Sequence, residues 1–192
     1  MSPAQDPSSL PRLFEAVSAA AERQDRGLPP VHLWNPPLCG EIDIRIRADG
    51  TWIHEGAPIG RLALVRLFSS VLRKDEDGFC LVTPAEKLRI TVEDAPFTAI
   101  GMERDGEVIR FATNVGDVVE AGPDHPIRID QGPGGAPRPY LHVRGGLEAL
   151  IARPVFYELV EMGEPVQTSD GLRLVVASHG VSFDLGALEA EA

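Results

Sequence analysis

Charged, amide and aromatic side chains recur where the predicted strands of this chain end, and together they have the chemistry to hold an organic phosphate. Lys87 and Arg128 can pair with a phosphate group, Arg128 through two parallel hydrogen bonds. Asn114 and either Glu93 or Asp94 can form hydrogen bonds with a ribose or a base. The candidate set also includes aromatic rings that can stack on a base, and it comprises Lys87, Arg89, Glu93, Asp94, Phe97, Thr113, Asn114, His125, Arg128 and Tyr140.

These candidates also have a purely structural interpretation. Lys87 and Arg89 fit solvated charges on a strand face, and the surface preference of such residues favours that interpretation. Asp94 can cap a turn, and Asn114 can adopt the left-handed backbone of a turn. His125 stands directly before a proline, where a turn residue is expected. The sequence leaves both interpretations open.

The familiar motifs of enzyme active sites are missing from the sequence. The histidines are scattered, without an HExxH or CxxC pattern and without a close carboxylate cluster. Neither GxSxG nor a phosphate-binding loop of the GxxxxGK[ST] or GxGxxG type occurs. We therefore assign no catalytic residue, no metal ligand and no cofactor. A hydrolase that uses His125 with Glu93 or Asp94 and a metal is kept as an alternative.

The charge balance limits the possible partners. The 192 residues include 18 Lys and Arg against 29 Asp and Glu, a net charge of -11 that repels DNA and RNA. A local group of cations can still hold one small anion. No apolar run approaches the roughly 20 residues of a membrane helix, and the amino terminus does not resemble a secretory signal. We expect a cytoplasmic protein without a membrane or nucleic-acid partner.

Strands and two helices must position the candidates. Ile42, Ile44 and Ile46 alternate with polar residues, the pattern of a half-buried strand, and the segment 51–54 is predicted to return after a turn at 48–50. Apolar residues from 59 to 72 are spaced as on a helix, and a strand follows at 78–83. Further strands are predicted at 88–92, 97–102, 108–113, 117–120 and 127–129, and the glycine-rich segment 131–137 is predicted to be a flexible loop or lid.

A short unit is repeated in the second half of the chain. Ile59-Gly60-Arg61 precedes the helix above, and Ile151-Ala152-Arg153 precedes a second predicted helix at 155–160. Strands at 140–144, 147–151 and 172–176 complete a second hairpin, helix and strand, so the sequence indicates an internal duplication. Arg61 and Arg153 stand where a cation opposes the helix dipole, which predicts a structural role with Asp77 and Asp170 as partners.

These patterns predict an α+β protein of two domains with a duplicated hairpin–helix–strand motif. We place an N-terminal helical segment at 1–26, a first α+β domain at 27–85 and a second, strand-rich domain at 86–192. The glycine-rich segment at 132–136 is the competing boundary.

Several short sequence segments, taken in their order along the chain, resemble those of an uncharacterised bacterial family, domain of unknown function 1285. They are WNPPLCGEIDIRI (34–46), DGTW (49–52), PIGR (58–61), VTPAEK (82–87), VEDAPF (92–97), TN (113–114), HPIR (125–128) and VFYELVE (155–161). The resemblance covers about residues 30 to 185.

The resemblance implies a two-domain fold whose carboxy-terminal half is a pleckstrin-homology-like barrel. It further implies binding of a nucleotide-like small molecule at the interdomain cleft and a role in signal transduction. The competing hypothesis is a protein–protein interaction module without a small ligand, which would require a protein partner.

Overall fold

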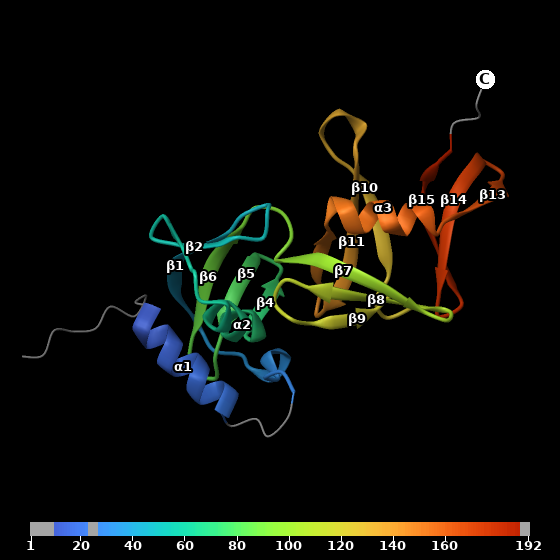
Figure 1. The fold of residues 1–192 in the computed structure, drawn as a ribbon. Helices are drawn as coiled ribbons and strands as arrows, with labels where there is room; N and C mark the ends of the chain where they lie inside the picture. Colours follow the sequence, from blue (N-terminus) through green and yellow to red (C-terminus); the bar gives the residue numbers. More distant parts are fainter. Residues whose placement is uncertain (1–9, 23–26, 189–192) are drawn as a thin grey trace, which may run out of the picture. The chain divides into compact units, whose positions relative to one another are not determined.

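The chain divides into two units of similar size. The structure is a computed structural model that describes residues 10–22 and 27–188. Unit 1 comprises residues 1–95 and unit 2 residues 96–192 (Figure 1). The boundary lies ten residues after the predicted one at 85/86, because the strand at 87–92 pairs with strands of unit 1.

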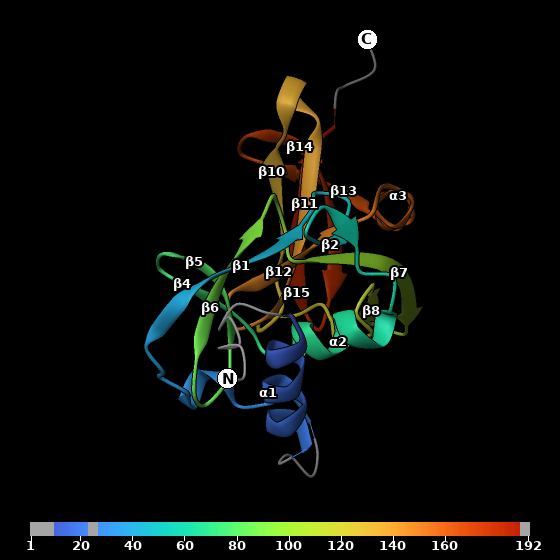
Figure 2. The same ribbon diagram turned by 90° about the vertical axis from the view of Figure 1, so that its left-hand side faces the viewer.

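Unit 1 is a six-stranded sheet with two α-helices beside it. Its elements are α1 (Leu10–Glu22), a 3-10 turn (Val31–Leu33), β1 (Leu38–Ile46), β2 (Trp52–His54), β3 (Ala57–Pro58), α2 (Leu62–Ser70), β4 (Leu72–Asp75), β5 (Gly78–Val82) and β6 (Lys87–Val92). The strand order is β3-β2-β1-β6-β5-β4, and only β1 and β6 are parallel neighbours. Figures 1 and 2 show α1 and α2 side by side.

Alternating side chains explain β1 and the hairpin it forms. Ile42, Ile44 and Ile46 are buried, whereas the polar residues between them are exposed. The turn to β2 is closed by Asp49, whose Oδ1 accepts the backbone N–H of Thr51 at 2.9 Å. The predicted hairpin is therefore confirmed. The helix predicted from the apolar spacing at 59–72 is also present, over Leu62–Ser70.

Unit 2 contains a second six-stranded sheet, one helix and a small third sheet. Its elements are β7 (Phe97–Asp105), β8 (Val108–Thr113), β9 (Val118–Glu120), β10 (Ile127–Gln131), a 3-10 turn (Pro133–Gly135), β11 (Pro137–Arg144), β12 (Leu147–Ile151), α3 (Arg153–Glu161), β13 (Glu164–Thr168), β14 (Gly171–Ser178) and β15 (Val181–Ala187). The large sheet has the order β10-β11-β12-β7-β8-β9 and curls like half of a barrel, and the small sheet has the order β13-β14-β15 (Figure 1). The two-domain α+β fold is confirmed.

Both large sheets have the same strand order. In each, two antiparallel groups of three strands are joined by one parallel pair, which is β1 with β6 in unit 1 and β7 with β12 in unit 2. This shared strand order is not the same as the repeat of hairpin, helix and strand that the sequence predicts. After α2 the chain returns to the large sheet, whereas after α3 it enters the small one. That duplication and the pleckstrin-homology-like barrel stay predictions.

The helices of the described residues are short or amphipathic. None of them is long and apolar enough to cross a membrane.

Candidate functional site

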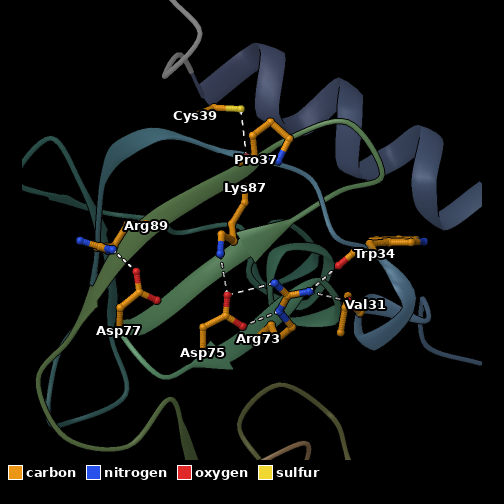
Figure 3. Close-up of polar contacts among 9 residues, drawn as sticks. All are labelled: Val31, Trp34, Pro37, Cys39, Arg73, Asp75, Asp77, Lys87 and Arg89. Atoms are coloured by element: carbon orange, nitrogen blue, oxygen red, sulfur yellow. Dashed lines mark hydrogen bonds and ion pairs between the residues drawn. The ribbon is translucent and has the colours of Figure 1, made fainter.

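Two of the predicted site residues, Lys87 and Arg89, lie on one face of β6 in a network of charges (Figure 3). The Lys87 ammonium donates a hydrogen bond to Oδ2 of Asp75 at 2.9 Å. Arg73 donates to both oxygens of the same carboxylate, at 2.6 Å from Nε and 3.0 Å from Nη2. Arg89 pairs with Asp77 beside them. The structure therefore places Lys87 and Arg89 together and gives each a carboxylate partner.

Strand register creates this network. Arg73 of β4 is opposite Cys80 of β5, and Cys80 is opposite Arg89 of β6, so the three side chains lie in one row across the sheet. Lys87 lies two residues before Arg89 and therefore emerges on the same face. The face is charged at its surface, whereas Cys80 beneath the charges is fully buried.

Hydrogen bonding controls the protonation states here. The hydrogen bonds from Arg73, and secondarily those from Lys87, lower the pKa of Asp75 to about 2. The same contacts raise the pKa of Lys87 and of Arg73. Burial, and then the neighbouring charge of Asp75, raise the pKa of the Cys80 thiol. Cys80 is therefore protonated at neutral pH and is a poor nucleophile.

Arg73 also anchors the proline-rich segment before β1. Its Nη1 donates to the carbonyl oxygens of Val31 at 2.9 Å and Trp34 at 2.6 Å. Cys39, the second residue of β1, is exposed, and its Sγ lies 3.4 Å from the carbonyl oxygen of Pro37 (Figure 3). The network thus has an evident structural task, because it ties this segment to β4 and β6.

Glu93 and Asp94 lie at the end of unit 1. Oε2 of Glu93 accepts the backbone N–H of Ala48 at 3.1 Å, and Oε1 lies 3.5 Å from Nη1 of Arg45. Glu93 therefore closes the turn of the β1–β2 hairpin, and Asp94 next to it is half-buried.

Phe97, Thr113 and Asn114 come together where β7 and β8 meet. Phe97 is fully buried, with the guanidinium carbon of Arg144 4.8 Å from its ring centre. Asn114 accepts the backbone N–H of Thr98 at 3.0 Å, and Oγ1 of Thr113 accepts that of Asp117 at 3.0 Å. These groups hold strands and turns in place. Asn114 does so without a positive φ, so the left-handed turn backbone predicted for it is wrong.

Arg128 lies on β10 and Tyr140 opposite it on β11, and His125 lies just before β10. The guanidinium carbon of Arg128 is 4.3 Å from the Tyr140 ring centre, and the guanidinium makes hydrogen bonds of 2.6 and 2.8 Å to Glu148, which raise its pKa further. The rings of His125 and His142 stack at 5.8 Å, and Nδ1 of His125 lies 3.2 Å from the carbonyl oxygen of His142. Across the described ranges, no three His, Cys, Asp or Glu residues are grouped so as to hold a metal.

A pocket of about 450 Å³ lies elsewhere in unit 2, between the start of β11, the end of β12 and α3. We call it the unit 2 pocket. Its walls combine proline and aliphatic side chains with two guanidinium groups and two aromatic rings, and they are formed by Ala136, Pro137, Arg138, Pro139, Leu150, Ile151, Ala152, Arg153, Phe156 and Tyr157. None of these residues is in the predicted set of site residues. Two features that are evident in the sequence nevertheless border the pocket, the Ile-x-Arg at 151–153 and the glycine-rich segment at 131–137.

Arg138 and Arg153 supply the positive charge of the unit 2 pocket. Nε of Arg138 donates to the Tyr140 hydroxyl at 3.0 Å. Arg153 is the first residue of α3 and is exposed, and no carboxylate of the described residues pairs with it. The predicted partner of Arg153, Asp170, instead contacts Ser169, and the predicted partner of Arg61, Asp77, is occupied by Arg89. The structural role predicted for the two arginines through these aspartates is therefore wrong.

The glycine-rich segment forms the edge of this pocket and is a closed turn. The backbone N–H of Gly132 donates to the carbonyl oxygen of Ala136 at 2.7 Å, directly after the last β10–β11 pair, Gln131 with Pro137. A Cβ at Gly132 would lie 2.8 Å from Cδ of Arg138. The turn and the guanidinium stem are thus in close contact, so the turn helps to set the position of Arg138.

Comparisons with known proteins agree on one family. Residues 29–95 match the N-terminal domain, and residues 96–185 the C-terminal domain, of the domain of unknown function DUF1285. No curated protein matches the chain.

Two crystal structures of family members are similar to this one. A DUF1285 family protein from Silicibacter pomeroyi DSS-3 is 49% identical, with 92% of this chain and 95% of that chain covered and a TM-score of 0.81. A DUF1285 family protein from Shewanella baltica OS155 is 27% identical, with 62% and 90% covered and a TM-score of 0.51. With both family domains matched in order along most of its length, the chain belongs to the DUF1285 family.

Proposed function

We propose that this protein is a ligand-binding protein that holds a nucleotide-like organic anion in the unit 2 pocket. The observation that carries the proposal is the composition of its walls, in which two guanidinium groups lie near Phe156 and Tyr157. Guanidinium groups suit a phosphate or carboxylate, and aromatic rings suit a flat heterocycle. The volume of about 450 Å³ falls within the usual range for small-molecule sites.

The charges around Arg153 support an anionic ligand. Arg110, Arg128, Arg144 and Arg173 of unit 2 each pair with a carboxylate, so their charge is already compensated. Arg153 has no such partner within the described ranges, and it is left to attract an anion from solvent. Local charge of this kind acts even in a protein with a net charge of -11, because distant charges are screened by salt.

A role in signal transduction is the second part of the proposal, and its support is the family resemblance alone. A ligand that binds one conformation more tightly than another shifts the population between them, which is how a small molecule can control a partner surface. The competing hypothesis is a protein-interaction module, and it predicts that no nucleotide gives a heat of binding.

Titration calorimetry tests the proposal. Adenosine and guanosine monophosphates and their cyclic forms are the probes, with adenosine and inorganic phosphate as partial ligands. We expect at least one nucleotide to bind with a dissociation constant below about 1 mM. Arg153→Gln should weaken it about tenfold or more, because a hydrogen bond to a charged group is lost. Arg104→Gln is the matched control, since Arg104 lies in the same unit at the far end of β7 and contacts the carbonyl oxygen of Gly106. Absence of binding by all four nucleotides, or equal loss in both variants, would refute the proposal.

A further inference from the structure

A second hollow surface lies in unit 1, between α1 and the start of α2. It has a volume of about 540 Å³, and we call it the helix groove. Six of its lining side chains are hydrocarbon, one is a hydroxyl and one is a guanidinium, and the lining residues are Leu10, Pro11, Phe14, Ser18, Arg61, Ala63, Leu64 and Leu67. It shares no residue with the unit 2 pocket.

The packing of the two helices explains why this surface remains open. α1 buries Leu13 and Val17, and α2 buries Val65 and Phe68. The groove residues are on the flanks of these buried stripes, so they face each other without filling the space between them. Phe14 is consequently 46% exposed. A gathered apolar surface of this kind commonly marks a binding site.

The position of Arg61 gives the helix groove a polarity. Arg61 is the residue before the first turn of α2, where a cation is opposed by the helix dipole, so it does not stabilise the helix. It is exposed, and no carboxylate among the residues described pairs with it. The groove is thus apolar along α1 and carries one uncompensated positive charge where α2 begins.

We propose that the helix groove binds a fatty carboxylate, with the acyl chain along α1 and the carboxylate at Arg61. A ligand that complements this surface needs a long apolar body and one negative end. Leu10 and Ser18 are eight residues apart, which is about 12 Å along a helix and favours an extended chain over a compact ring. The single guanidinium matches one carboxylate.

In this proposal, both copies of the Ile-x-Arg repeat contribute an arginine to an anion-binding site. Arg61 and Arg153 each line a hollow beside the helix that follows, and each is free of a described carboxylate. The two hollows differ in their walls. The groove of unit 1 is almost wholly hydrocarbon, whereas the unit 2 pocket has a second guanidinium and a phenol, so the two arginines select different anions.

The test uses octanoate, decanoate and dodecanoate below their micelle concentrations, with decanol as the uncharged match for decanoate. Binding to the full chain is measured by calorimetry. We expect affinity to rise about fourfold for each added methylene group, because each buried methylene contributes a constant increment. Decanoate should bind at least tenfold more tightly than decanol, since the alcohol cannot pair with Arg61.

Variants separate this proposal from nonspecific apolar binding. Arg61→Gln should remove the advantage of decanoate over decanol, whereas Arg66→Gln, an equal change of charge on the exposed face of α2, should keep it. Ala63→Phe should weaken both ligands by filling the groove, and thermal melts confirm that each variant folds.

Three results would overturn the proposal. They are equal binding of acid and alcohol to the unaltered protein, an Arg61→Gln variant that keeps the preference, and no binding of any carboxylate. If the protein is a dimer that Ala63→Phe dissociates while decanoate does not bind, the occupant is a second copy of the chain and the proposal fails. None of these outcomes depends on nucleotide binding in unit 2.

Discussion

Asp75 shows how strongly a single residue organises unit 1. Its carboxylate accepts hydrogen bonds from Arg73 and Lys87, and Arg73 in turn holds the carbonyl oxygens of the segment before β1. Neutralising this one carboxylate therefore leaves two cations of the network without their shared partner. The cost should depend on pH, because the pKa of Asp75 is about 2 in the folded protein and 3.8 is its ordinary value.

Asp75→Asn is expected to lower the free energy of unfolding by about 2 kcal/mol at pH 7. The folded pKa lies below the unfolded one, so the stabilisation is complete above about pH 4 and is lost as the pH falls through 2. Urea unfolding of both proteins from pH 7 to pH 2 should show their stabilities converging in acid. A constant difference across that range would contradict this prediction.

The sequence predicts this network only in part. It indicates that Lys87 and Arg89 are on a strand face, and their charges do lie together on β6. It does not show that Arg73 and Lys87 share Asp75, because that contact depends on the register of β4, β5 and β6. β4 itself has the sequence LRKD, with three charges and no apolar alternation, and it begins directly after a helix.

Among the elements, β14 is connected to the large sheet of unit 2 by one buried serine. Oγ of Ser178 accepts the backbone N–H of Ile109 at 3.0 Å and donates to the carbonyl oxygen of Ala121 at 2.7 Å. Ser178 is 1% exposed, so water cannot replace either contact without rearrangement. The next residue, His179, lies 2.9 Å from Oε2 of Glu120 and adds a contact at the surface.

Ser178→Ala should destabilise the protein by about 1–3 kcal/mol, because the amide of Ile109 is left buried without a partner. Ser182→Ala, on the exposed face of β15, is the matched control and should change stability by less than about 0.5 kcal/mol. Thermal and urea unfolding monitored by circular dichroism give both values. Equal stability of the two variants would mean that the bridge from Ser178 contributes nothing.

The strands that the sequence predicts correctly are those with a buried face. β1 and β8 contain buried and exposed side chains in alternation; β1 was evident from its apolar periodicity, and β8 from the turn signals beside it. β13 escaped prediction because all five of its residues are exposed, so no apolar period exists to be found. The unit 2 pocket was not predicted for another reason. Its walls come from β11, β12 and α3, and no short segment of sequence contains all three.

At the scale of the whole molecule, each unit has its own sheet and its own buried core. The fully buried side chains of unit 1 include Leu13, Phe68 and Leu81, and those of unit 2 include Phe97 and Phe111. The strand order of each large sheet uses strands of one unit alone. Domains of about 100 residues commonly bury enough apolar surface to fold independently.

Residues 96–192, expressed alone, are therefore expected to unfold cooperatively in urea. Both tryptophans, Trp34 and Trp52, are in unit 1, so far-ultraviolet circular dichroism and the tyrosine signal must report on unit 2. Coincident transitions by the two probes would indicate a two-state domain. A gradual, non-cooperative loss of signal would show that unit 2 requires unit 1.

The parallel strand pairs determine when a nascent chain can complete each sheet. Ile46 of β1 pairs with Val92 of β6, 46 residues later, and Phe97 of β7 pairs with Ala149 of β12, 52 residues later. While the ribosome is still translating, β1 must therefore wait with one edge unsatisfied until β6 emerges, and β7 must wait for β12. The amino-terminal sheet can close before synthesis of the second is finished. Each half of the chain therefore has its own period during synthesis in which an unpaired strand edge can aggregate.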